Sequence, residues 1–132
     1  MMVSQQTRLQ VLDVMDRFAL HCSRKEVEEA GSLVHPEFFG FFREGERVEG
    51  RESFSVHLRR ILDRCDEVRI SFEDIMIGAE GTIVWITGTC CTRCIRDNEE
   101  IKYATRFSTV MRGTGHAWLF AMFHLSPGGS SS

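Results

Sequence analysis

The sequence predicts an α+β fold in which three N-terminal helices pack on a strongly curved antiparallel sheet that forms a cone with an internal pocket. Two observations support this prediction. Apolar residues recur with helical spacing in the first half of the chain and with β spacing from residue 67 onward. Residues 105–126 have the pattern of a β-hairpin whose second arm is apolar at almost every position, so both faces of that arm need a cover. Helices kept to one side of an antiparallel sheet cover one of these faces.

The first half of the chain is predicted to contain three helices and a small strand pair. The helices span residues 5–22, 24–34 and 52–65, and the strands span 38–42 and 47–49, joined by a turn over 43–46. Ser23 and Glu26 have the spacing of a capping box at the start of the second helix. Pro36 ends that helix, because the residue before a proline avoids helical geometry.

The second half is predicted to form a meander of four long antiparallel strands. These strands span residues 67–77, 82–95, 101–112 and 117–126. Apolar alternation shifts parity after Glu73 and Asp74, which indicates a β-bulge that curves the sheet. We expect residues 1–126 to form one domain and residues 127–132 to form a flexible tail.

Composition excludes several classes of partner. The net charge is −3 and the chain has no long basic run, which argues against a nucleic-acid binder or a polybasic membrane anchor. No window approaches the roughly 18 apolar residues of a membrane-spanning helix. The first eight residues lack the apolar core of a secretory signal, so we expect a cytoplasmic protein.

Five cysteines are present, and an odd number without a secretory signal indicates reduced thiols. Cys91 and Cys94 form a CxxC motif, but no second ligand pair recurs at the spacing that a zinc site needs. In a strand, Cys90 and Cys94 share one face and Cys91 lies on the other. We therefore predict small strand residues here, with no metal and no cofactor.

Two polar groups, Arg106 and His124, interrupt otherwise apolar strands. If they point inward with Trp85 and Thr87, the pocket has aromatic walls and one guanidinium, which suits a small organic carboxylate. Two alternatives remain open: Arg106 forms a salt bridge with a glutamate such as Glu73, and His124 is a hydrogen-bonded core histidine.

The opposite face of the 101–112 strand presents Tyr103, Phe107 and Met111. Such an apolar patch suits an isologous two-fold interface. We therefore expect a homodimer through the outer face of the sheet, with a second subunit covering what the helices cannot reach.

Three segments resemble the nuclear transport factor 2-like superfamily and its SnoaL-like domains. They are His35-Pro36-Glu37 before the aromatics, Val48-Glu49-Gly50, and Thr105-Arg106 with Trp118 and Phe123-His124-Leu125-Ser126. The superfamily includes polyketide cyclases, ketosteroid isomerases and scytalone dehydratases. Local matches are to the association (hub) domain of calmodulin-dependent protein kinase II. The resemblance implies a cystatin-like cone, a pocket inside it, and a dimer built sheet against sheet.

The resemblance also implies roles for individual positions. In the hub domains an arginine at the position of Arg106 lines the pocket and meets carboxylates, while a second pocket arginine falls here on Thr87. The tyrosine of the isomerases falls on Phe18, and their aspartate base falls near Phe42. Neither phenylalanine can transfer a proton, so both are expected to be pocket walls.

Three functions follow as hypotheses. The first is a dimeric domain that binds a small apolar or carboxylate-bearing molecule. The second is a lyase, cyclase or isomerase in which His124 acts as acid or base, with Asp74 as the nearest carboxylate to orient it. The third is an oligomerisation scaffold. The fold alone does not distinguish these three hypotheses, because proteins with this fold have many different functions.

Overall fold

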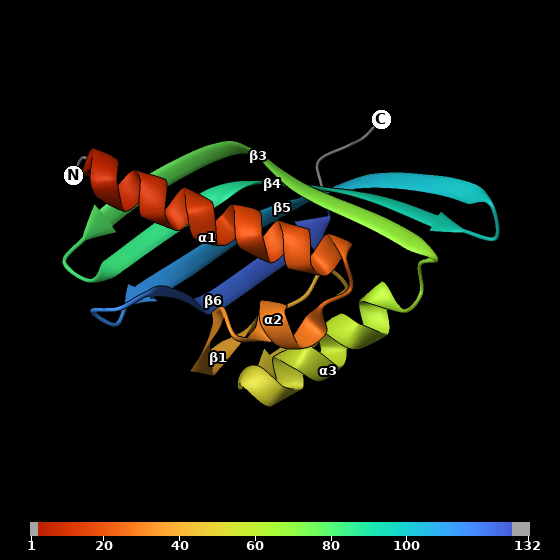
Figure 1. Ribbon diagram of the computed structural model, residues 1–132, viewed down its shortest axis with the longest axis horizontal. Helices are drawn as coiled ribbons and strands as arrows, with labels where there is room; N and C mark the ends of the chain where they lie inside the picture. The colour runs from red at the N-terminus through yellow and green to blue at the C-terminus, as the bar shows by residue number, and fades with distance from the viewer. Residues whose placement is uncertain (1–2, 128–132) are drawn as a thin grey trace.

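The computed structural model describes residues 3–127 as helices packed on one face of a six-stranded sheet (Figure 1). In chain order the elements are α1 (Gln5–Ser23), α2 (Val27–Gly31), β1 (Val34–Phe41), β2 (Arg47–Glu49), α3 (Arg51–Leu62), β3 (Glu67–Glu80), β4 (Ile83–Arg96), β5 (Glu99–Gly113) and β6 (Trp118–Pro127). The strand order is β2-β1-β6-β5-β4-β3. The predicted α+β class is confirmed. Pro127, predicted to belong to the tail, ends β6, and residues 128–132 lie outside the described part of the chain.

The sheet is mixed, whereas the sequence predicted an antiparallel one. β1 pairs in parallel with β6, and all other neighbours are antiparallel. Gly40 makes the parallel pairing sterically feasible, because a Cβ at this position would lie 2.1 Å from the carbonyl oxygen of Phe123. The N-terminal strand pair thereby joins the four-stranded meander in one sheet.

α1 confirms the predicted first helix. The hydroxyl of Ser4 caps it by accepting a hydrogen bond from the backbone N–H of Thr7 at 3.1 Å. Its buried stripe packs toward the sheet, and it lies along β3 (Figure 1). α2 and α3 lie together beyond it, next to β1.

α2 is shorter than predicted, and the predicted capping box does not form. Pro36 does not end this helix, because the helix ends at Gly31 and Pro36 lies within β1. Ser23 ends α1, and its hydroxyl donates to the carbonyl of Ala19 at 2.8 Å instead of capping α2. Lys25 has φ = 59°, which breaks the helix between α1 and α2. The Glu26 carboxylate makes no cap and lies 2.8 Å from Nδ1 of His21.

The predicted bulge in β3 is confirmed. The pairing with β4 passes from Glu73 opposite Thr89 directly to Met76 opposite Thr87, and Asp74 has φ = 54°. This parity shift keeps Ile75 and Ile77 packed on the core, as Ile70 and Phe72 are before it.

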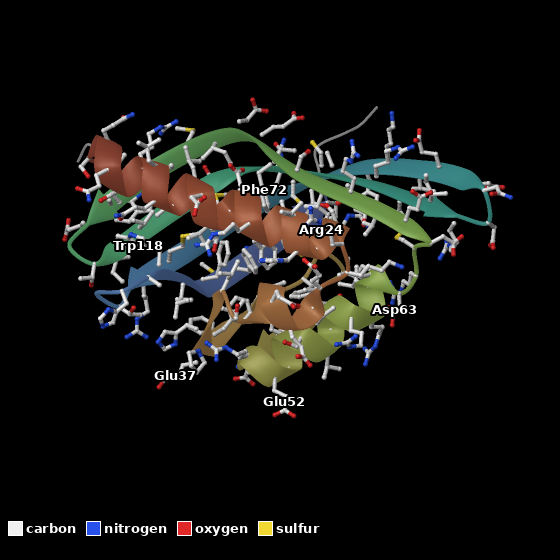
Figure 2. All side chains as sticks on the ribbon, in the orientation of Figure 1. Arg24, Glu37, Glu52, Asp63, Phe72 and Trp118 are labelled. Carbon is white, nitrogen blue, oxygen red and sulfur yellow. A yellow bond between two sulfur atoms is a disulfide. The ribbon has the colours of Figure 1, made fainter. Side chains whose placement is uncertain are left out.

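A cluster of aromatic rings forms the centre of the core. It joins α1, β1, α3 and β6, with ring centroids between 4.9 and 6.1 Å apart, through Phe18, Phe38, Phe54, Phe120 and Phe123. Figure 2 shows side chains filling the space between the helices and the sheet. Such tilted and edge-on pairs add to the stability that burial already provides. Within residues 3–127, no helix combines the length and apolar character needed to cross a membrane.

Candidate functional site

An apolar cavity of about 120 Å³ lies between α1, α3 and the inner face of the sheet. Phe18 and Phe42, which the resemblance implied as pocket walls, both line it. α3 contributes Leu58 and Ile61, and β3 contributes Phe72, whose ring lies 5.1 Å from that of Phe107. The cavity is therefore lined mainly by hydrophobic side chains from both layers of the fold and is partly open to solvent.

The sheet gives this cavity a small polar floor. Cys90 and Thr92 of β4 line it, and their register partners on β5 are Thr105 and Tyr103. Alternation places all four on one face, as it does in any strand pair. Three hydroxyls and a thiol therefore face a cavity that is otherwise apolar.

Two free thiols of the cavity are protonated at neutral pH. Burial raises the pKa of Cys90 to about 11, and a hydrogen bond from Thr92 offsets only part of this increase. Burial also raises the pKa of Cys22 on α1, with a smaller contribution from the neighbouring Cys90. Because the thiolate is the nucleophile, these cysteines are unreactive small hydrophobic groups here.

Arg43 is the charged side chain among the described residues that line the cavity. It follows β1, and its guanidinium carbon lies 4.8 Å from the ring centroid of Tyr103. Arg43 lies in an exposed turn, in agreement with the predicted turn over 43–46, but the sequence analysis did not name it as a pocket residue. Its position next to Phe42, which was predicted to line the pocket, was the signal that could have identified it.

A disulfide joins Cys65, which lines the cavity, to Cys94 on β4. The prediction of reduced thiols is wrong for this pair and correct for Cys22, Cys90 and Cys91, which are free. The two bonded cysteines are 29 positions apart, but their Cα atoms are only 5.5 Å apart. Among the described residues no group of three or more histidine, cysteine or acidic side chains could hold a metal ion.

The four other predicted pocket residues point away from the cavity. Arg106, His124, Trp85 and Thr87 are exposed and belong to the outer face of the sheet. The prediction that they point inward is wrong, because alternation identifies which residues share a face but not which face the helices cover. Both alternatives fail as well within residues 3–127: Arg106 forms no ion pair, and His124 is not in the core.

The residues predicted to form the dimer interface lie on the inner face of the sheet, opposite to the predicted face. Phe107 and Met111 are buried, and Tyr103 lines the cavity, so none of the three can form an outer patch. His124 cannot act as an acid or base in the cavity, because it lies on the outer face of the sheet. Its ring lies 6.2 Å from that of Phe41, on the side of the sheet away from the cavity.

The sequence profile of the SnoaL-like domain matches residues 11–129, which is most of the chain. This protein belongs to the SnoaL-like domain family. No curated protein matches it in sequence.

Solved structures show the same fold at low sequence identity. A proposed dehydratase of the NTF2-like family from Streptomyces avermitilis is 15% identical, with a TM-score of 0.85 and coverage of 95% of this chain and 99% of that one. A cystatin-like protein of unknown function from Nostoc punctiforme is 12% identical, with a TM-score of 0.82 and coverage of 98% and 97%. A proposed calcium/calmodulin-dependent protein kinase II association domain from Xanthomonas campestris is 13% identical, with a TM-score of 0.81 and coverage of 91% and 86%. At these identities the likeness shows the fold alone.

The cavity of this SnoaL-like domain offers hydroxyls, protonated thiols and a guanidinium around an apolar interior. The nearby imidazole of His57 lies 5.8 Å from the Phe42 ring, and its Nδ1 lies 3.1 Å from the carbonyl oxygen of Ser53. These groups can hold an apolar body and orient a polar substituent.

Proposed function

We propose that this SnoaL-like domain binds a small apolar ring that carries an anionic group such as a carboxylate. One observation supports the proposal above all: among the described residues that line this apolar cavity there is a single guanidinium, that of the exposed Arg43, beside the polar floor. The ring is held among phenylalanines, and the carboxylate meets Arg43.

The size of the cavity limits the ligand to about one ring. Its volume of about 120 Å³ is close to the roughly 150 Å³ of an engineered apolar cavity that binds benzene. A larger ligand needs movement of the walls. Burying one ring against Phe18, Phe42 and Phe72 supplies the hydrophobic part of the binding free energy.

Arg43 provides the charge that selects an acid. Its guanidinium is held against the face of Tyr103, which limits the conformations that binding must restrict. A planar guanidinium stacked in this way keeps its N–H edges for a bidentate carboxylate pair.

Benzoate and benzyl alcohol test the proposal as a matched pair of ring ligands. In Arg43→Gln we expect benzoate affinity to fall about tenfold, equal to about 1.4 kcal/mol, with benzyl alcohol affinity unchanged. Arg106→Gln, which removes an arginine from the outer face, is the control and leaves both affinities unchanged. Calorimetric titration measures all six combinations of the two ligands with the unmodified protein and the two variants. Equal losses in the two variants, or no benzoate binding to the unmodified protein, would refute the proposal.

We also propose a homodimer through the outer face of the sheet, built from different residues than the sequence analysis named. Strand register places Phe39, Met122, Val110 and Trp85 in one row across β1, β6, β5 and β4. Phe39 and Trp85 are 60% and 45% exposed. A continuous apolar row on one sheet face suits a second copy of the same surface.

A further inference from the structure

The Cys65–Cys94 disulfide connects the two walls of the cavity. Cys65 lies three residues beyond the end of α3 and lines the cavity. Cys94 lies on the same face of β4 as Cys90 and Thr92, which form part of the cavity floor. The bond therefore ties the helical wall to the sheet at the rim of the binding site. Asp63, labelled in Figure 2, marks this end of α3.

α3 covers the cavity without close packing on the strands opposite. Its apolar face contributes Phe54, Leu58 and Leu62 to the cavity lining, whereas its main neighbours are α2, β1 and β2. The cavity itself occupies the space between this face and β3 to β5. On the side of the cavity that faces β3 to β5, the α3 wall therefore has few direct contacts to hold it in place.

Two hydrogen bonds assist the disulfide at the end of α3. The ammonium group of Lys25 donates to the carbonyl of Cys65, and the backbone N–H of Asp66 donates to the carbonyl of Ile95 at 2.7 Å. Both anchor the backbone of the loop after α3. The disulfide is the covalent connection between this loop and the floor of the site.

We propose that this disulfide is a redox-controlled latch on the ligand cavity. In the oxidised protein it holds the α3 wall against the sheet and slows ligand exchange; in the reduced protein the wall opens more often. The latch rests on the proposed ligand-binding function and adds its regulation. The α3 wall exchanges between a closed and an open position, and the disulfide shifts this equilibrium toward the closed position.

The chemistry of the latch is thiol–disulfide exchange with a dithiol reductant. One reductant thiolate attacks a sulfur of the pair and forms a mixed disulfide, while the other cysteine leaves as a thiolate and takes a proton. The second reductant thiol then closes the reductant's own disulfide and releases the remaining cysteine. Two electrons and two protons pass to the protein, which gains two thiols. Cys22 and Cys90 do not compete as attacking groups, because burial keeps both protonated.

Fluorine NMR with 4-fluorobenzoate measures the latch directly. We expect the dissociation rate of this probe to rise roughly fivefold or more when dithiothreitol reduces the protein. C65S/C94S should behave as the reduced protein does, with or without dithiothreitol. The control is Cys91→Ser, which keeps the disulfide and should retain the full response. Thiol titration of the denatured protein verifies each state: three of the five cysteines are free when the bond is intact.

Amide hydrogen exchange separates the latch from the binding proposal, since it needs no ligand. Reduction should speed exchange in the C-terminal half of α3 and leave α1 unchanged. If the probe binds with equal rates in both redox states, the latch is refuted while the binding function stands. If the probe does not bind at all, the binding function fails, and unchanged exchange in α3 then refutes the latch as well. Reduced wild-type protein is measured beside the double variant, so the test does not depend on that variant's folding.

Discussion

The two faces of the sheet are made by the same strands and carry similar kinds of residues, but they have opposite environments. On β5 and β6 the inner face presents Phe107 and Phe123, which are 3% and 6% exposed. The outer face presents Phe39 and Trp85 to solvent, together with Arg106. A displacement of one residue along a strand separates a cavity wall from a surface position. The comparison shows that apolar character alone does not identify the covered face; the helices do.

The inner face should dominate stability. Phe107→Ala should lower the free energy of unfolding by about 3–5 kcal/mol, because it removes a buried ring that packs against Phe72. Urea denaturation at two protein concentrations measures the change. We expect the same loss at both concentrations, since the side chain is internal to one chain. Val56→Ala on the exposed side of α3 is the control, with a change within about 0.5 kcal/mol. A small effect of Phe107→Ala would reverse the assignment of the faces.

The disulfide at the rim of the inner face is the next largest contribution. C65S/C94S should lose about 3.5 kcal/mol of stability, as expected for a bond that closes a loop of this length. Thermal unfolding under non-reducing conditions compares it with wild type, and Cys91→Ser is the matched control with no loss. If both variants unfold with the wild-type midpoint, the bond does not form in the folded protein.

The outer face should matter for assembly and not for the fold. Phe39→Asp should raise the dimer dissociation constant by about thirtyfold or more, equal to about 2 kcal/mol, because it replaces the most exposed ring of the apolar row, at the β1 end, with a charge. Sedimentation velocity over a concentration series measures this change. Leu9→Asp alters an exposed leucine of α1 and should leave assembly unchanged. A wild-type protein that is monomeric at all concentrations would contradict the dimer.

Much of the fold could be predicted from the residues alone. Alternation identified the four long strands, the bulge at Glu73 and Asp74, and the face that Cys90 shares with Cys94. These features are local, so a short stretch of sequence contains the information that specifies them.

The face of the sheet that carries the site was not predicted correctly from the sequence. Arg106 and His124 drew attention because they are polar among apolar neighbours, and the resemblance implied a pocket role for Arg106. On β5, comparison of the two faces favours the face of Phe107 and Met111 as the inner one, because the positions that alternate with them include two arginines, a serine and an alanine. That comparison predicts the observed inner face.

Contacts between segments distant in sequence were also not predicted. The parallel contact between β1 and β6 and the bond between Cys65 and Cys94 join segments that are distant in sequence. A cysteine count cannot give a connectivity. The antiparallel pairing of β3 with β4, which sets Val68 opposite Cys94, is what brings Cys65 into range.

One measurement tests most directly whether the inner face is the binding face. Intermolecular NOEs from the ring protons of benzoate to assigned methyl groups report on both faces in a single experiment. We predict NOEs to Leu58, Ile61 and Leu125, which line the cavity, and none to Val110 on the outer face. NOEs to Val110 in the absence of contacts to the three cavity residues would contradict the assignment of the inner face as the binding site.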